Sequence, residues 1–442
     1  MGYRKHLLKI AAATLTLLPY LTVAQSSSIN TYSPYTFYGI GDMQVQGPSM
    51  LRNMGGSGYG VRNGYSNFLT INYLNPASYS ATARSSFLFN FGLEGQNFYE
   101  RQREATAQAL RKTSFNTVNF NEVAFQMPLG KDVGFALNVT PFSNVGYRVE
   151  RTEDDSDILA DIGHVKYIYQ GTGGVTQVSA GVGWAPAKWI SLGAEATYYW
   201  GSITRSYTTA ITMITGTGVY SNTTASDKDN VAKVLGNFGL QVIPVDNARN
   251  KVIIGGVYRM GGKFGLHRTR NISGNSVTLD SVVYSSVTTD FQLPQSIGGG
   301  VSLYRRTWNI NADYTYQDWS RNGYDEKNRF RYVDTHTVKI GGQYTPNAGD
   351  VRHFLNRVSY RAGVRYGNYF GEINGEKIDE VAFSLGVGIP FKFLGTSAVN
   401  AGVELGQRGR LNAGLIRERY FKFTIGLSLF GEDYWFTKRK YD

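Results

Sequence analysis

The sequence predicts an all-β protein, a transmembrane antiparallel β-barrel of about 14 strands with an N-terminal plug in its lumen. Three observations support this fold class. Polar and apolar residues alternate over long runs, glycine and tyrosine are abundant, and no stretch of the mature chain reaches the ~18 apolar residues of a membrane-spanning helix. Because only every second residue of a barrel strand faces lipid, the mean hydropathy of -0.28 is compatible with a membrane barrel.

The first element, residues 1–24, has the parts of a secretory signal peptide. Three basic residues precede the apolar run Ile10–Leu18, and Thr22–Ala24 supplies the small residues of a cleavage site. The apolar run is too short to span a membrane. A buried N-terminal helix is the alternative, but the run has no amphipathic face.

The second element, residues 25–83, is rich in Gly, Ser and Asn and lacks the alternation of a strand. We expect it to fold inside the barrel as a plug, or hatch. The candidate plug residues lie in two short motifs and are Gly39, Gly41, Asn75, Pro76 and Ala77.

Residues 84–431 form the predicted barrel. The cleanest alternation lies within 307–318, where Trp308, Ile310 and Tyr314 share one face and Asn309 and Asp313 share the other. Comparable runs predict strands at about 84–98, 114–128, 132–150, 165–184, 188–206, 232–244, 251–270, 283–304, 307–320, 333–345, 354–369, 377–391, 396–408 and 418–430. A soluble propeller is the alternative, but the chain shows no blade-length repeat and the outward faces are strongly apolar.

The connections are expected to alternate between short turns and longer loops at about 99–113, 151–164, 207–231, 271–282 and 321–332. Short periplasmic turns and longer outer loops are typical of outer-membrane barrels. An even strand count places both ends of the barrel chain on the periplasmic side, with residues 432–442 as a periplasmic tail.

The third predicted strand contains a break at Pro141, Phe142 and Ser143. Proline cannot donate to a sheet ladder and occurs at edges or bulges. A tolerated bulge and a side opening in the wall are both compatible with this break.

Several charged residues are predicted to face the lumen: Arg259, Lys339, Arg361, Arg365, Glu195, Asp313 and Glu404. Such groups are costly when buried without partners. We expect them to pair with one another and hold the plug; a charged path for a polar solute is the alternative.

Composition argues against several function classes. The net charge of +12 raises the question of nucleic acid, but the basic residues are scattered and no nucleic-acid module is present. The chain has no Cys, its five His residues lack metal-ligand spacing, and no Gly-x-Ser-x-Gly elbow occurs. We therefore expect no enzyme activity, no metal, no cofactor and no nucleic-acid partner.

These features resemble the FadL/TodX family of outer-membrane transport proteins. Asn75–Ala77 follows a Gly-rich segment and precedes the first strand, as the family's Asn-Pro-Ala does. Leu293–Gly300 and Asn309–Ser320 are similar to the family's Leu-Pro segment and to the strand after it, and Pro141 lies where the family has a third-strand kink. Ser33–Gly41 and the ending Trp435–Tyr441 are similar to the Bacteroidota branch.

The resemblance implies a fourteen-stranded barrel in the outer membrane of a Gram-negative bacterium, with an N-terminal hatch. It implies uptake of hydrophobic compounds such as long-chain fatty acids, past the plug and out sideways at the third-strand break. Expected partners are outer-membrane lipid, lipopolysaccharide and hydrophobic small molecules. The alternative is an accessory barrel subunit of an outer-membrane protein assembly complex, with other outer-membrane proteins as partners.

Overall fold

The computed structural model describes residues 31–432 apart from short gaps. The gaps are 66–68, 84–85, 104–109, 154, 162, 213–221, 248, 275–281, 326–328, 393–395 and 412–414. The signal peptide at 1–24 and the tail, from 433 on, lie outside the described residues and stay predictions. Within the described part, no helix is long and apolar enough to cross a membrane.

The chain forms a closed antiparallel barrel of 14 strands, which confirms the predicted fold class. Its strands are β2 (Ser86–Arg103), β3 (Leu110–Gly130), β4 (Val133–Thr152), β5 (His164–Ala187), β6 (Ile190–Thr212), β7 (Thr223–Asp246), β8 (Asn250–Arg259) continued by β9 (Gly262–Gly274), β10 (Val282–Leu293) continued by β11 (Ser296–Arg305), β12 (Trp308–Gln317), β15 (Thr335–Tyr344), β16 (Ser359–Ile373), β17 (Glu376–Lys392), β18 (Thr396–Arg408) and β19 (Arg417–Glu432). The last strand, β19, pairs with β2 along its length and closes the barrel.

The alternation of the sequence decides which side chains face outward. In β11, Ser296 and Ser302 are buried, whereas Ile297, Val301 and Leu303 are exposed on the outer face. The same pattern recurs around the wall, since strands send successive side chains to opposite faces. The result is an apolar outer band of the kind that barrels present to hydrocarbon.

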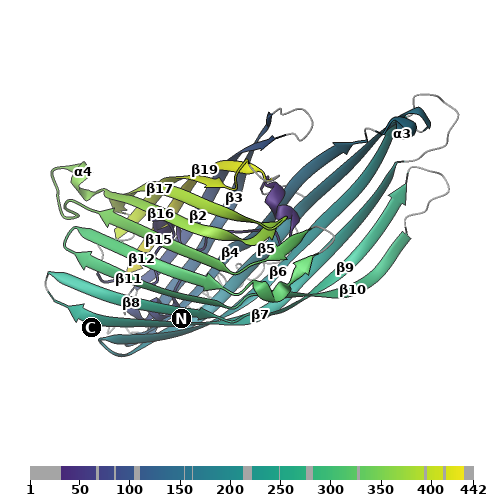
Figure 1. The fold of residues 1–442 in the computed structure, drawn as a ribbon. Coiled ribbons are helices and arrows are strands. Elements are labelled where there is room, and N and C mark those ends of the chain that lie inside the picture. Colours follow the sequence, from purple (N-terminus) through teal and green to yellow (C-terminus); the bar gives the residue numbers. More distant parts are fainter. Residues whose placement is uncertain are drawn as a thin grey trace, which may run out of the picture.

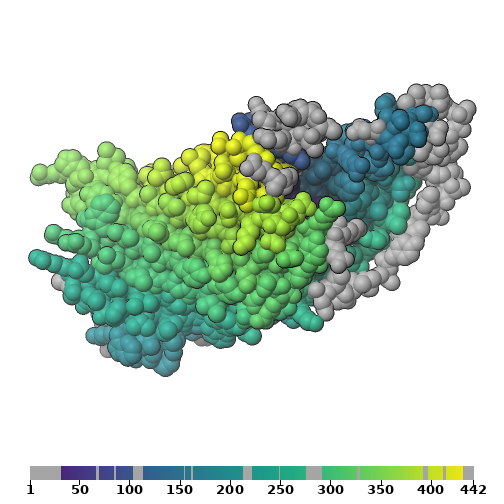
Figure 2. Space-filling model, viewed as in Figure 1, coloured from purple at the N-terminus to yellow at the C-terminus, as the bar shows by residue number. Residues whose placement is uncertain are grey.

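The wall is much taller on one side than on the other. β5, β6 and β7 have 23 or 24 residues each, and the continued strands β8–β9 and β10–β11 are of similar length, whereas β12 and β15 have 10. The tall strands β4–β7, together with β9 and β10, extend beyond the rest of the barrel toward α3 (Ser156–Asp161), as Figures 1 and 2 show. We call this end the loop end and the opposite one, with the short connections, the turn end.

The prediction of a loop at 207–231 is wrong in part, because many of these residues belong to β6 and β7. Tyr207 pairs with Ala225 and Thr209 pairs with Thr223, so β6 and β7 continue as a ladder well beyond the expected limit. Threonine is favoured in strands by its branched Cβ. The Thr- and Ser-rich composition here therefore indicates an extended wall.

Smaller elements complete the fold. They are η1 (Pro34–Phe37), β1 (Asp42–Met43), α2 (Ser49–Arg52), η2 (Pro76–Ala81), η3 (Ser320–Asn322), β13 (Tyr324–Asp325), β14 (Phe330–Tyr332) and α4 (Phe354–Arg357). α4 lies in the connection from β15 to β16 at the turn end (Figure 1), where the sequence predicts a short link.

Candidate functional site

Residues 31–83, which we call the N-terminal segment, lie mostly inside the barrel in their described part and contact every strand of its wall. Hydrogen bonds or ion pairs join it to inward-facing groups of β2–β8, β11, β12 and β16–β19. The remaining strand, β15, contributes Lys339, whose Nζ lies 5.9 Å from the centre of the Tyr59 ring. The lumen is therefore filled from within the same chain.

Near the turn end, the motif Asn75–Ala77 packs directly against wall glycines. Asn75 caps η2 by accepting the Ala77 amide at 3.1 Å, and its Nδ2 donates to the carbonyl of Leu240. A Cβ atom at Gly193 would lie 2.3 Å from the Ala77 nitrogen, and one at Gly239 would lie 2.1 Å from Asn75 Oδ1. The glycines let the two backbones approach, which fits the predicted position of this motif in the plug.

A second group of wall glycines receives the turn after α2. A Cβ atom at Gly363 would lie 2.2 Å from the Gly55 nitrogen, and one at Gly402 would lie 1.9 Å from Asn53 Oδ1. Glycines on β6, β7, β16 and β18 thus touch the N-terminal segment from different sides of the barrel. The described residues of 47–83 are therefore packed between these glycine-containing strands.

Buried acids of the wall bind this part of the segment. Arg52 Nη1 lies 2.5 Å from Glu94 Oε2, and both side chains are less than 10% exposed. Glu122 accepts the backbone amide of Ser49 at 2.7 Å and its hydroxyl at 2.6 Å. Burial of charge requires such partners; these contacts supply them and fix the start of α2.

The predicted lumen charges have two kinds of partner. Glu195 accepts from the Tyr79 hydroxyl at 2.6 Å, and Asp313 accepts from the backbone amides of Gly58 and Tyr59, so these two acids hold the N-terminal segment. Arg365 pairs with Glu404 at 2.9 Å within the wall.

Arg361 bonds to neutral groups of the wall, namely Gln343 and Asn400. Lys339 and Arg259 border an internal cavity, described below. The predicted charges therefore do not form one cluster; they serve different parts of the lumen.

The wall has a seam between β3 and β4. Their pairing runs from the turn end to Val123 and Val139; beyond those residues, within the described chain, β3 and β4 form no ladder. The edge of β4 is covered by the N-terminal segment: Asp42 and Met43 of β1 pair with Asn144 and Ser143. The N-terminal segment thus supplies a short strand to its own barrel wall at this seam.

The break predicted at Pro141 lies at this seam. The β4–β5 ladder shifts register between Pro141 and Ser143, which is a bulge. Pro141 accepts a hydrogen bond from Gln46, Ser143 donates to the Ile40 carbonyl, and Phe142 is buried against Tyr199. All three residues are covered in this state.

Two glycines allow the N-terminal segment to follow the seam. Gly39 and Gly41 have φ of +57° and +88°, in the region that favours glycine. A Cβ atom at Gly41 would also lie 2.4 Å from the carbonyl oxygen of Asn144. The carbonyl of Gly39 accepts a hydrogen bond from Arg205 of β6 at 2.5 Å.

Two cavities border residues 34–46. The inner one, of about 170 Å³, has a lining that is polar and apolar in equal parts and includes the charged residues Asp42, Arg259, Lys339, Arg365, Glu380 and Arg408. The outer one, of about 320 Å³, lies at the loop end and is mostly apolar, with Tyr35, Phe37, Tyr38, Tyr169, Leu415 and Ile416 among its lining residues. The N-terminal segment separates the two.

Comparison with protein families decides the assignment. The BamG family model matches residues 7–442, almost the whole chain. The chain belongs to the BamG family. A comparison with curated proteins finds no match.

Solved structures share the barrel of this BamG-family chain. The CymD monoaromatic hydrocarbon channel is similar with a TM-score of 0.54 and 16% identity, over 88% of this chain and 99% of that one. A Pseudomonas aeruginosa FadL homologue gives 0.57 and 13%, over 89% and 99%, and the P. putida toluene transporter TodX gives 0.56 and 15%, over 88% and 99%. At these identities the likeness establishes a FadL-type barrel fold.

Sequence reasoning missed several residues that join the N-terminal segment to the wall of this BamG-family barrel. Glu94 and Glu122 lie on the inward faces of β2 and β3. They could have been found from the sequence, because both fall on the polar side of the alternating pattern. The pair of Arg408 and Asp42, at 2.9 Å, joins β18 to β1. No pattern links those two residues in the sequence, because they are far apart along the chain.

Proposed function

We propose that the protein is an accessory barrel subunit of an outer-membrane protein assembly complex in a Gram-negative bacterium. In this proposal, residues 25–83 are a fixed plug, 84–431 are the membrane barrel and 432–442 are a periplasmic tail. The observation that carries the proposal is the contact between the N-terminal segment and every strand of the wall. A barrel filled in this way is a rigid body that can hold partners without conducting solutes.

The internal cavity supports the same proposal. Pockets for small apolar ligands usually measure about 300–1,000 Å³ and have mainly apolar linings. The inner cavity, of about 170 Å³, is smaller and is lined by at least six charged side chains. Moving a hydrocarbon through it would strip those charges of their polar surroundings, which is costly.

Membership of the BamG family, whose model matches residues 7–442, is compatible with an assembly role. The extended loop end offers a surface for partners: β4–β7 extend beyond the rest of the wall, and α3 lies at this end between β4 and β5 (Figure 1). We further propose that the chain comes from the Bacteroidota branch that its sequence motifs resemble.

Co-purification from native membranes tests the proposal. After mild cross-linking and detergent extraction, we expect assembly-barrel components in a stoichiometric ratio to the tagged protein. Replacing residues 153–163 at the α3 tip by a short Gly-Ser turn should lower that recovery, whereas shortening 347–352 at the turn end serves as the matched control. Recovery of the barrel alone would contradict the proposal.

A second candidate is uptake of hydrophobic compounds, and the outer cavity is the observation that favours it. Its volume, about 320 Å³, and its aromatic lining suit an apolar molecule that arrives at the loop end. In this candidate, Gly39 and Gly41 act as hinges, Asn75–Ala77 as the fixed base of the hatch, and Pro141–Ser143 as the side exit.

Uptake of labelled toluene and of a labelled long-chain fatty acid separates the two candidates. Cells lacking residues 31–46 and cells carrying Tyr38→Ala should change their uptake if the barrel transports these compounds. Under the assembly proposal, uptake matches that of cells without the protein, and only the co-purified partners change.

A further inference from the structure

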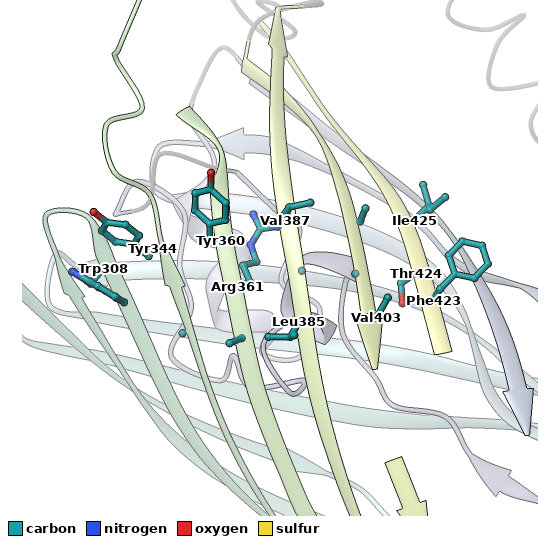
Figure 3. Close-up of a pocket in the computed structure, with 15 residues that line it drawn as sticks. Trp308, Tyr344, Tyr360, Arg361, Leu385, Val387, Val403, Phe423, Thr424 and Ile425 are labelled. Atoms are coloured by element: carbon teal, nitrogen blue, oxygen red, sulfur yellow. The ribbon is translucent and has the colours of Figure 1, made fainter. Parts of the chain in front are cut away.

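The outer wall carries a groove on the strands that follow the β11–β12 turn. Its volume is about 900 Å³, and it crosses β12 and β15–β19 close to the turn end. Figure 3 shows Trp308, Tyr344 and Tyr360 on one side of it and Phe423 and Ile425 on the other. Because these side chains point away from the lumen, the groove faces the membrane.

Strand register explains why the wall is hollowed here. One row of outward residues across the strands runs Trp308, Tyr344, Tyr360, Val387, Ala401 and Ile425. The next row runs Ile310, Gly342, Ala362, Leu385, Val403 and Phe423. Gly342, Ala362 and Ala401 fall diagonally between large side chains, so they form a floor between raised sides.

Two exposed arginines flank the groove at its β12 edge, next to Trp308. Arg305 pairs in register with Trp308, points to the same outer face as Leu303, and is exposed. Arg306 follows it in the β11–β12 turn, where it is also exposed. Aromatic residues next to basic ones are typical of the level at which barrel walls meet lipid headgroups.

We propose that this groove is a binding site for one glycerophospholipid of the periplasmic leaflet. Its acyl chains lie in the groove over Ala362 and Ala401, and its phosphate is bound by Arg305 and Arg306. The lining is mainly apolar, although it includes Arg361 and Thr424, and therefore suits acyl chains. The two neighbouring arginines are complementary to an anionic phosphate. The site is independent of the proposed function, because it lies on the outer wall and uses no residue of the plug.

Native mass spectrometry of the full-length barrel tests the site. Protein delipidated in detergent is incubated with palmitoyl-oleoyl phosphatidylethanolamine, and the bound fraction is measured. We expect one retained lipid, and Ala362→Phe, which fills the floor, should weaken binding by about tenfold. Ala194→Phe is the matched control, because Ala194 is an outward-facing alanine of β6 away from the groove.

The two arginines are tested separately. Arg305→Gln and Arg306→Gln should each weaken binding by about fivefold, the effect expected of one basic residue near a membrane surface. Arg249→Gln is the control, since Arg249 is an exposed arginine of the β7–β8 turn. Equal lipid retention in Ala362→Phe and Ala194→Phe would overturn the proposal.

A photo-reactive amino acid at position 403 tests the occupant in native membranes. Val403 lies in the groove and is 37% exposed. A phospholipid adduct supports the proposal. A cross-linked protein band in its place would overturn it, because the groove would then bind a neighbouring membrane protein.

Discussion

The two halves of the N-terminal segment are held in different ways. Residues 47–83 press their backbone against wall glycines such as Gly193 and Gly363, and their charges meet buried acids. Residues 33–46 follow the edge of β4 through hydrogen bonds, and Asp42 forms an ion pair with Arg408 of β18. A cavity lies on each side of this stretch. The comparison suggests that the first region anchors the plug, whereas the second seals the seam.

The largest expected effect comes from the anchor. Arg52→Met removes the closest cation from buried Glu94 and leaves it with a hydrogen bond from Gln96 and with the more distant Lys422, at 3.9 Å. Breaking a buried ion pair costs about 3–5 kcal/mol. We expect a clear fall in the midpoint of thermal unfolding in detergent. This midpoint is measured from the heat-dependent mobility shift of the barrel on gels.

The double variant Arg52→Met with Glu94→Gln is the control, since the amide removes the uncompensated buried charge and still offers an oxygen to Gln96 and Lys422. It should recover most of the lost stability. If the single and double variants are equally unstable, the ion pair is not what anchors α2.

A smaller effect is expected at the glycine contacts. Gly193→Ala drives a Cβ atom to within 2.3 Å of the Ala77 nitrogen, and overpacking of this kind costs about 1–3 kcal/mol. Gly256→Ala on β8 is the control, because a Cβ atom there has no neighbour within 4 Å. The difference in thermal midpoint between Gly193→Ala and Gly256→Ala measures the contact between the plug and the wall. Equal midpoints would show that residues 47–83 are not packed tightly against the wall.

The smallest global effect is expected at the seam. Asp42→Asn weakens the contact with Arg408, but Arg408 keeps Glu380 at 2.9 Å, so about 1–2 kcal/mol should be lost. Hydrogen exchange should rise in residues 40–46 and 142–146 while 50–60 stay protected. Equal hydrogen exchange in residues 40–46 and 50–60 would show that the two halves of the N-terminal segment are held equally firmly.

The sequence alone predicts the barrel well, because alternation is a local signal. The rows from Trp308 to Tyr316 and from Val381 to Ile389 specify which face meets lipid without any knowledge of neighbours. The loop predicted at 207–231 is too long, because a threonine-rich composition is also typical of loops. In the structure, the β-branched threonines of the two strands pair and continue the β6–β7 ladder.

The candidate site was less predictable. Glu195 and Asp313 were identifiable as inward charges, but their partners, Tyr79 and the amides of Gly58 and Tyr59, depend on how the N-terminal segment folds in the lumen. The break at Pro141 was visible in the sequence. That β1 covers the adjacent edge could not be predicted, since two residues of strand give no periodic signal.

A reversible cross-link across the seam tests the central claim most directly. The chain has no cysteine, and Met43 and Ser143 are register partners, so Met43→Cys with Ser143→Cys can form a disulfide between the N-terminal segment and β4. If the plug is fixed, the oxidised protein co-purifies with its assembly partners and supports growth as well as the reduced one. Loss of function on oxidation, with recovery on reduction, would contradict a fixed plug and show that the segment must move.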